Sequence, residues 1–361
     1  MKLKNDFHPR LFGFTGLSGS GKTTLIEKII KELANYQIGY IKHDAHKFEM
    51  DYPGKDTFRQ YAAGAHVVFI NDADHLALNV RGESKGLEKE YFKDCDLVLV
   101  EGHKYSPHPK FVFLDEEEKL ADEIKEGKIT NIMGLITRDG RDGSFHRNDV
   151  NGIIAFIKAK IEASTQTPYG LVLTGGQSSR MGIDKALISY HGRPQAEYLY
   201  TLLEEVGLKT FISCREDQLE RKEVRELSSI SDRFVNFGPL GGILSAMATH
   251  PERAWLVVAC DLPLVTAENI KELLRVRDPF KQATAFYNQE REQFEPLFAI
   301  YEGTMYSRML HFLSEGVTCP QKVLFNSSIK KVSLESQGFL QNVNTPEEKK
   351  RVLKLLKEVT P

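Results

Sequence analysis

A glycine-rich stretch between an apolar run and an amphipathic segment restricts the fold of this chain more than any other feature. Residues 16–23 read GLSGSGKT, follow the apolar run 11–15, and match the pattern G-x-x-x-x-G-K-[ST]. After the loop, leucine and isoleucine recur at helical spacing, at Leu25, Ile26, Ile29, Ile30 and Leu33. We therefore predict a buried strand, a phosphate-binding loop and a helix in this order.

This loop predicts a nucleotide site in the first half of the chain. Its backbone N–H groups can hold phosphate oxygens, while the Lys22 ammonium reaches the outer phosphates and the Thr23 hydroxyl can bind Mg²⁺. Glu101 ends the apolar run 97–100, where P-loop folds carry a carboxylate for the metal ion, although a surface glutamate before a turn is the alternative. The expected nucleotide-binding residues are Gly16, Ser18, Gly19, Ser20, Gly21, Lys22, Thr23 and Thr24.

A second glycine-rich loop lies in residues 171–187, LVLTGGQSSRMGIDKAL. Residues 171–173 predict a buried strand, and the two glycines after it let a polyphosphate settle on free backbone N–H groups. Arg180 and Lys185 would add positive charge against an anionic ligand, whereas an ordinary turn with two solvated cations is the alternative. The expected nucleotide-binding residues here are Leu173, Thr174, Gly175, Gly176 and Lys185.

Two aspartates follow apolar stretches or precede glycines in the same half. Residues 254–265, AWLVVACDLPLV, predict a buried strand with Asp261 at its carboxyl end. An acid at that place in an open α/β sheet faces the ligand crevice, so Asp261 is the first choice for a Mg²⁺ ligand and a nucleotide contact; a helix N-cap is the alternative. Asp232 precedes the glycines of residues 238–244, GPLGGIL, which permit close approach of a ligand, and a solvated loop acid is its alternative.

The best linker of the chain separates these two halves. Residues 150–161 carry isoleucine and phenylalanine on one helical face, and the small, polar segment EASTQTP follows. We predict domains at residues 1–162 and 169–361, joined by a linker at 163–168. Near the end of the chain, Thr345 and Glu348 form the pattern of a capping box that starts the last helix.

Composition excludes several classes of protein. The chain has 361 residues, of which 41% are hydrophobic and 27% charged, and its formal net charge is −2. We therefore expect a globular protein whose main partner is neither nucleic acid nor a membrane. No apolar run approaches the roughly 20 residues that span a bilayer. The four cysteines lie far apart and form no C-x-x-C pair, which favours a reducing cytoplasm.

Longer strings in both halves resemble known families. GLSGSGKTT, IKHDAH, GKDT, AGAH and VLVEGHK resemble the MobB-type P-loop accessory proteins of molybdenum cofactor synthesis. The loop 171–187, with its Arg-Met-Gly and Asp-Lys, resembles nucleotidyltransferases and, among them, the MobA-type molybdenum cofactor guanylyltransferases. The resemblance implies a natural fusion of the two types. It also implies an α/β chain with an N-terminal P-loop NTPase fold and a C-terminal Rossmann-like nucleotidyltransferase fold.

The resemblance implies a reaction as well. Such an enzyme transfers GMP from GTP to molybdopterin and releases pyrophosphate, with Mg²⁺ as the metal ion and with Arg180, Lys185 and Asp261 as catalytic residues. Asp232 would help to hold the guanine nucleotide. The motif N-x-N-T-P would place two amides near the cofactor substrate, those of Asn342 and Asn344.

Expectations about partners follow from the same resemblance. The first half is expected to bind GTP, to hydrolyse it slowly, and to assist the second half. A molybdopterin-loading protein, molybdoenzyme apoproteins and a second copy of the chain are the expected protein partners. The strand 294–301 would line the acceptor side, with Glu295 and Pro296 shaping the pocket rather than reacting.

Three alternatives stay open at this point. First, the pattern GG-x-x-x-R-M-G is shared with cytidylyltransferases and sugar-phosphate nucleotidyltransferases, and the sequence has no N-K-x-D motif to read guanine. Second, a GTP-dependent carrier or adaptor would bind the cofactor without transferring anything. Third, the P-loop half would serve only as a docking module.

Overall fold

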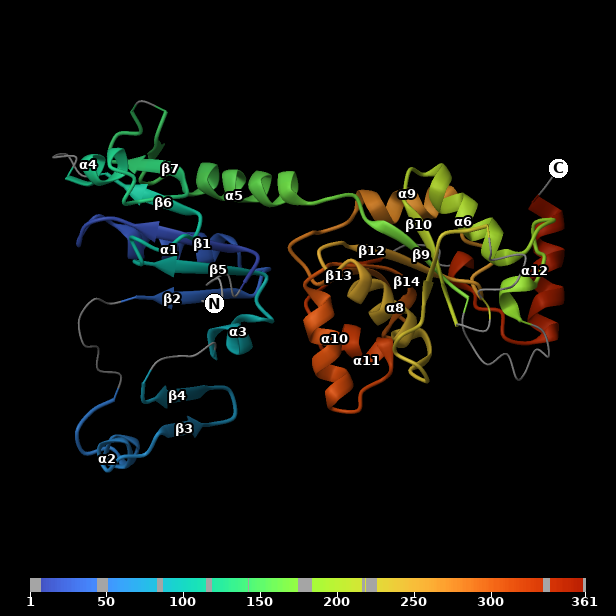
Figure 1. Cartoon of the computed structure of the whole chain (residues 1–361), viewed down its shortest axis with the longest axis horizontal. Helices are drawn as coiled ribbons and strands as arrows, with labels where there is room; N and C mark the ends of the chain where they lie inside the picture. Colours follow the sequence, from blue (N-terminus) through green and yellow to red (C-terminus); the bar gives the residue numbers. More distant parts are fainter. Residues whose placement is uncertain are drawn as a thin grey trace. The chain divides into compact units, whose positions relative to one another are not determined.

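A computed structural model of the chain describes residues 8–43, 51–82, 87–114, 119–141, 143–174, 184–215, 218, 226–333 and 338–359 (Figure 1). The chain divides into two compact units, Met1–Ala155 and Phe156–Pro361. This boundary lies inside helix α5 (Val150–Ser164), upstream of the predicted linker, whose limits stay a prediction. The predicted α/β class is confirmed in both units.

Parallel strands build the main sheet of the first unit. In the described residues the strand order is β2-β5-β1-β6-β7-β8, and every neighbouring pair is parallel. Because β1 lies beside β5, the start of the glycine-rich loop and the predicted metal carboxylate meet at one edge of the sheet. The strands are β1 (Leu11–Thr15), β2 (Ile38–Lys42), β5 (Leu97–Glu101), β6 (Lys110–Phe113), β7 (Ile132–Thr137) and β8 (Phe145–His146).

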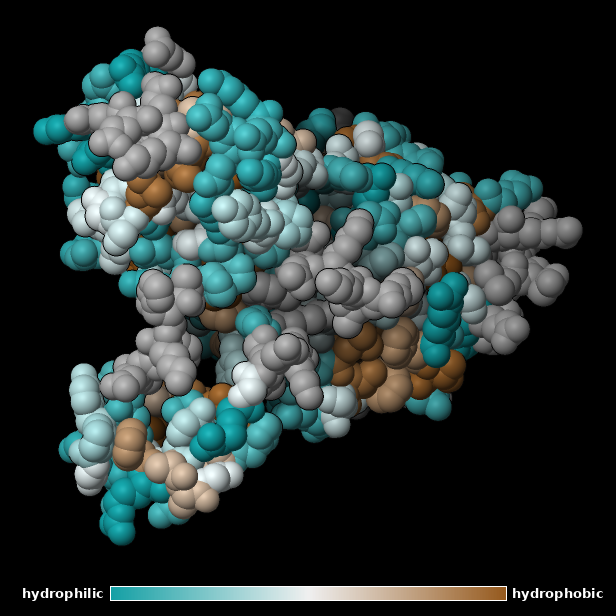
Figure 2. Space-filling view, turned by 60° about the vertical axis from the view of Figure 1, so that its left-hand side comes forward, coloured by the Kyte–Doolittle hydropathy of each residue, from teal (hydrophilic) through white to brown (hydrophobic). Residues whose placement is uncertain are grey.

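Helices and a separate hairpin complete the first unit. Helix α1 buries Leu25, Ile26 and Ile29, as the helical spacing predicts. The antiparallel strands β3 (Val67–Asn71) and β4 (Leu76–Val80) form their own two-stranded sheet and carry apolar side chains that are at least half exposed. Figure 2 shows mostly hydrophilic side chains on the visible face, with apolar ones in separate patches. The helices are α1 (Lys22–Glu32), α2 (Asp56–Ala62), α3 (Leu87–Phe92) and α4 (Lys119–Lys125).

The second unit is organised around a mixed sheet. Its order in the described residues is β11-β10-β9-β12-β14-β13-β15, and β14 runs antiparallel to both of its neighbours. The predicted strands at 171–173 and 294–301 are present, and the one predicted within 254–265 is present but ends at Ala259, two residues before Asp261. The strands are β9 (Tyr169–Leu173), β10 (Thr210–Cys214), β11 (Ser229–Ser231), β12 (Trp255–Ala259), β13 (Ala283–Asn288), β14 (Gln293–Tyr301) and β15 (Ile329–Val332).

Helices cover both faces of this sheet. Side chains of α6 and α9 share one buried cluster with the strands, and side chains of α8, α10 and α11 share another. Both clusters follow from strands that are apolar on both faces, which is typical of a sheet between two helical layers. The helices are α6 (Gln195–Glu205), α8 (Gly238–Thr249), α9 (Ala267–Arg275), α10 (Met305–Ser314), α11 (Pro320–Phe325) and α12 (Pro346–Val359), with short 3₁₀ turns η1 (Lys185–Leu187) and η3 (Gly338–Leu340).

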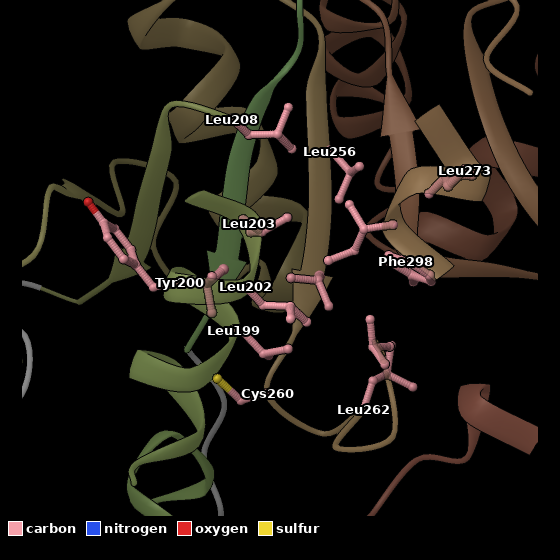
Figure 3. Close-up of a cluster of buried hydrophobic side chains, with 14 of the residues drawn as sticks. Leu199, Tyr200, Leu202, Leu203, Leu208, Leu256, Cys260, Leu262, Leu273 and Phe298 are labelled. Atoms are coloured by element: carbon pink, nitrogen blue, oxygen red, sulfur yellow. The ribbon is translucent and has the colours of Figure 1, made fainter. Parts of the chain in front are cut away.

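The core fixes the backbone around the predicted metal ligand Asp261. Its neighbours Cys260 and Leu262 are buried in the same cluster as Leu199 and Phe298 (Figure 3). Burial of a side chain such as leucine contributes about 1.5–3 kcal/mol. The residues on either side of Asp261 are therefore anchored, and the position of its carboxylate is set by packing.

An ion pair ties the start of the second unit to its core. Arg277 donates to both oxygens of Glu302, at 2.7 and 2.8 Å, and its third contact is the backbone oxygen of Gln166, at 2.9 Å. Both charged side chains are nearly buried. Gln166 therefore belongs with the second unit by contact, although it lies before the first strand of that unit. In the part of the chain that the structure describes, no helix is long and apolar enough to cross a membrane.

Candidate functional site

The glycine-rich loop of the first unit has the backbone that a phosphate-binding loop needs. It connects β1 to α1, and Gly19 and Gly21 have φ angles of 75° and 96°. Residues with a side chain rarely adopt this left-handed backbone conformation, whereas glycine adopts it readily. The predicted strand, loop and helix are confirmed.

The Lys22 side chain lies over this loop. Its Nζ donates to the backbone oxygens of Gly16 and Leu17, at 3.1 and 2.7 Å, and to Oγ of Ser20 at 3.3 Å. Burial lowers the pKa of Lys22, and the nearby charge of Glu101 opposes this effect. The ammonium is thus held by oxygens of the loop itself, where a phosphate would offer the same kind of partner.

Glu101 ends β5 directly beside the loop. Oγ1 of Thr23 donates to both carboxylate oxygens, at 2.9 and 3.0 Å, and the Tyr40 hydroxyl donates to one of them at 2.8 Å. Burial and this hydrogen bond raise the pKa of Tyr40 to about 12. The structure therefore brings together the two predicted metal ligands of the first unit. Tyr40 was not predicted, because the sequence does not show that β2 pairs with β5.

In the second unit, Asp261 and Lys185 are brought together. The backbone N–H of Cys260 donates to the Leu173 oxygen at 3.2 Å, so Asp261 follows at the point where the glycine-rich loop leaves β9. Nζ of Lys185 is 3.5 Å from Oδ2 of Asp261. Burial raises the pKa of Asp261, and the Lys185 ammonium opposes the shift. The other oxygen, Oδ1, is buried and has no hydrogen-bond partner among the described residues.

The two predicted asparagines lie on either side of a residue that contacts the Asp261 backbone. Between them, the Val343 N–H donates to the backbone oxygen of Asp261 at 2.8 Å. Asn344 accepts a hydrogen bond from Lys185 at 2.5 Å, and Oδ1 of Asn342 is buried without a partner in the described part of the chain. One backbone contact therefore holds the motif N-x-N against the end of β12.

A capping box fixes the chain direction after this motif. The Glu348 carboxylate accepts from the N–H groups of Asn344 and Thr345, at 2.6 and 3.0 Å, and Oγ1 of Thr345 accepts from the Glu348 N–H at 3.2 Å. The predicted capping box at the start of α12 is confirmed.

The side chains of Asp232 and Thr174 both form hydrogen bonds with Ser213. Oγ of Ser213 donates to Oδ1 of Asp232 at 2.6 Å, and Oγ1 of Thr174 donates to the Ser213 backbone oxygen at 2.6 Å. Burial raises the pKa of Asp232, and the hydrogen bond from Ser213 opposes this. These contacts place Asp232 near the end of β9, and its contact with a nucleotide stays a prediction. Gly175, Gly176 and Arg180 lie outside the described residues.

A cavity of about 580 Å³ adjoins the asparagine motif. Its lining combines aromatic, cationic and amide side chains with the carboxylates of Glu295 and Glu348. Burial and the nearby charge of Asp261 raise the pKa of Glu295 to about 7, against hydrogen bonds that lower it. The predicted acceptor strand thus contributes a carboxylate with unusual properties, which the residue pattern alone did not indicate.

The donor set at both sites fits Mg²⁺. Among the residues that the structure describes, no cluster of three or more His, Cys, Asp and Glu could hold a metal ion by itself. Mg²⁺ is usually bound by one or two carboxylates together with substrate phosphates and water. Asp261, one oxygen of which is buried without a partner in the described part of the chain, and Glu101, with Thr23, are donors of this kind.

Comparisons with known proteins match the two halves of the chain to different families. The family described as "Molybdopterin guanine dinucleotide synthesis protein B" (MobB) matches residues 11–138, and the "MobA-like NTP transferase domain" matches residues 170–328. The first range includes the P-loop and Glu101, and the second includes Lys185, Asp232 and Asp261.

Two relatives decide the family. The chain is 31% identical over 198 residues to a molybdenum cofactor guanylyltransferase of Xanthomonas euvesicatoria. This match covers 52% of this chain and 96% of that protein. It is also 36% identical over 130 residues to a probable molybdopterin-guanine dinucleotide biosynthesis adapter protein of Bacillus subtilis. That match covers 34% of this chain and 73% of the relative. The chain belongs to both families.

A third relative carries a combined name. The molybdenum cofactor biosynthesis bifunctional protein of Synechocystis sp. is 34% identical over 185 residues. The match covers 51% of this chain and spans about half, 53%, of that relative's length. The predicted fusion of a MobB-type adapter with a MobA-type guanylyltransferase is confirmed. Asn342 and Asn344 lie beyond the range that the MobA-like family matches.

Proposed function

We propose that this chain is a molybdenum cofactor guanylyltransferase that transfers GMP from GTP to molybdopterin, with its first unit as a GTP-binding adapter. The cluster of Lys185, Asp261 and Asn344 is the observation that carries this proposal. It combines a cation, an amide beside the start of a glycine-rich loop, and a carboxylate with one oxygen that has no hydrogen-bond partner among the described residues. The names of the guanylyltransferase relatives support the choice of GTP and molybdopterin.

The proposed step is an in-line displacement at phosphorus. An oxygen of the terminal phosphate of molybdopterin forms a bond to the α-phosphorus of GTP, and the bond from that phosphorus to the oxygen bridging to the β-phosphate breaks. The electron pair of the broken bond leaves with pyrophosphate. Because the attacking phosphate is already anionic, positioning and charge neutralisation supply most of the catalysis, and no strong general base is needed.

Each residue of the cluster has a proposed part in this step. Lys185 neutralises charge on the triphosphate, together with Arg180 and the Gly175 and Gly176 amides of the loop. Asp261 would hold Mg²⁺ in this unit, and Thr23 with Glu101 would hold it in the first. Mg²⁺, when bound, supplies charge neutralisation at phosphate oxygens. Asp232 is proposed to contact the guanine nucleotide.

The first unit is proposed to bind GTP and to hydrolyse it slowly. Two contacts support a nucleoside triphosphate site: the Lys22 ammonium binds a backbone oxygen of the loop, and the Thr23 hydroxyl donates to the Glu101 carboxylate. A molybdopterin-loading protein, molybdoenzyme apoproteins and a second copy of the chain stay predictions as partners, and the cytoplasm stays the predicted location.

Release of pyrophosphate from GTP tests the proposal. The purified full chain is expected to release pyrophosphate with GTP and molybdopterin together, and not with GTP alone. Parallel reactions with CTP, and with sugar phosphates as acceptors, separate the other nucleotidyltransferases. Binding of molybdopterin without any pyrophosphate release would instead favour the carrier or adaptor. The Asp261→Asn variant is expected to lose most of this release.

A further inference from the structure

The Glu295 carboxylate lies on the wall of the cavity with hydrogen-bonding capacity to spare. Oε1 accepts from the Leu297 N–H at 3.0 Å, and the side-chain amide of Asn342 also donates to this carboxylate. An ionised carboxylate has about four lone-pair sites on its two oxygens. Among the described residues these two donors use half of that capacity, so two acceptor positions there have no donor and can take hydrogen bonds from a ligand.

No positive charge among the described residues compensates the negative charge of Glu295. In the described part of the chain, the charged group that acts on it is Asp261, which carries the same sign, and no cation contributes. Next to it, the Asn342 oxygen is buried and unpartnered in the same region. A half-buried anion beside an unpaired amide oxygen is costly until hydrogen-bond donors reach it. This wall of the cavity is therefore suited to a ligand that presents N–H groups.

Other walls of the cavity restrict the ligand further. Phe294 and Leu340 provide apolar lining, and Arg291 provides a cation that suits a phosphate. The Arg351 cation lies near the Glu348 carboxylate of the same lining. A ligand that matches all three parts has a flat ring, an edge with paired N–H donors, and an anionic phosphate. The amino-pyrimidinone edge of a pterin offers a 2-amino group and a ring N–H side by side. A sugar phosphate offers hydroxyls but lacks the flat ring and the paired donor edge.

We infer that Glu295 determines the acceptor of the second unit by accepting hydrogen bonds from the amino-pyrimidinone edge of a phosphorylated pterin. This inference rests on the proposed function, because it concerns the acceptor of the same reaction. Glu295 touches the ring of the substrate and lies away from the phosphorus that reacts. Its loss therefore acts on binding of the acceptor rather than on the chemical step.

Kinetics of Glu295→Gln in the full chain test this role. Glutamine has nearly the same size and keeps an oxygen for the Leu297 N–H, but it replaces an acceptor by an N–H₂ donor that faces the donors of the ligand. We expect KM for molybdopterin to rise about 10- to 100-fold, while KM for GTP stays within about twofold. The matched control is Glu290→Gln, which removes an exposed carboxylate of the same hairpin outside the cavity lining and leaves both KM values unchanged.

Inhibition of the unaltered chain gives a second test that does not depend on how the variant folds. Pterin is expected to compete with molybdopterin at least about tenfold more strongly than lumazine, in which an oxygen replaces the 2-amino group. Equal competition by the two compounds, or an unchanged KM for molybdopterin in a folded Glu295→Gln, would overturn the inference. If the unaltered chain releases no pyrophosphate with molybdopterin, the proposed function fails instead.

Discussion

The raised pKa of Glu295 predicts a pH-dependent stability of the second unit. Burial and the charge of Asp261 raise this pKa from 4.5 to about 7, so the folded unit favours the neutral carboxyl below pH 7 and the ionised carboxylate above it. The stabilisation is fully present below pH 4.5, the value in the unfolded chain, and is lost as the pH rises through 7. One pKa unit corresponds to about 1.4 kcal/mol, so the unit should lose about 2 kcal/mol from this group between pH 5 and 8.

The variant Glu295→Gln isolates this contribution. Glutamine does not ionise, so its free energy of unfolding relative to the unaltered chain should improve by about 2 kcal/mol from pH 5 to pH 8. Effects of the substitution that do not depend on pH cancel in this difference. Urea unfolding followed by Trp255 fluorescence measures it in the second unit, because this single tryptophan of the chain is fully buried in β12.

The exposed carboxylate of Glu290 again supplies the control. Its replacement by glutamine should leave the difference between pH 5 and pH 8 unchanged. If Glu295→Gln and the unaltered chain respond equally to pH, the carboxylate is not held in a costly environment. The reasoning from its burial and from the nearby aspartate would then be refuted.

Three further predictions concern the nucleotide sites. Asp261→Asn should lower pyrophosphate release about 100-fold or more while Trp255 fluorescence stays unchanged; release at the parent rate would remove this residue from the mechanism. Lys185→Met should abolish release but raise the affinity of the nucleotide-free chain for Mn²⁺ about tenfold, because the ammonium 3.5 Å from Asp261 repels a cation there. Titration of Mn²⁺ into Lys185→Met with and without Asp261→Asn isolates this site, and an equal or lower affinity contradicts the prediction. Lys22→Ala should lower the GTP bound per chain from two equivalents to one in calorimetry, and two equivalents in the variant would place the first site elsewhere.

Local patterns predicted the elements and much of the candidate site. Glycines with lysine and threonine at fixed spacing predicted the loop after β1, and an acid after an apolar run predicted Glu101 at the end of β5 and Asp261, which lies two residues beyond β12. Such patterns work because each depends on a few adjacent residues. The contact of Lys185 with Asp261 agrees with these patterns, since Lys185 follows the glycine-rich loop that leaves β9 and Asp261 follows the parallel neighbour β12.

Other features depend on pairing between distant segments and could not be predicted. Tyr40 reaches Glu101 only because β2 is the neighbour of β5 in the sheet. The environment of Glu295 arises from β14 and the asparagine motif together, with Asp261 nearby. No short string of residues encodes these neighbours. The sequence therefore predicted only that Glu295 shapes the pocket, and it did not predict that the carboxylate is buried near the like charge of Asp261.

The hydrogen bond from Arg277 to the Gln166 oxygen has a practical consequence for dissecting the chain. A fragment that begins at Tyr169, with the first strand of the second unit, discards this acceptor and leaves a nearly buried guanidinium one partner short. A fragment that begins a few residues earlier keeps the full set of contacts. When the two fragments are expressed separately, the N-terminus of the longer one should resist proteolysis, whereas the N-terminus of the shorter one should fray.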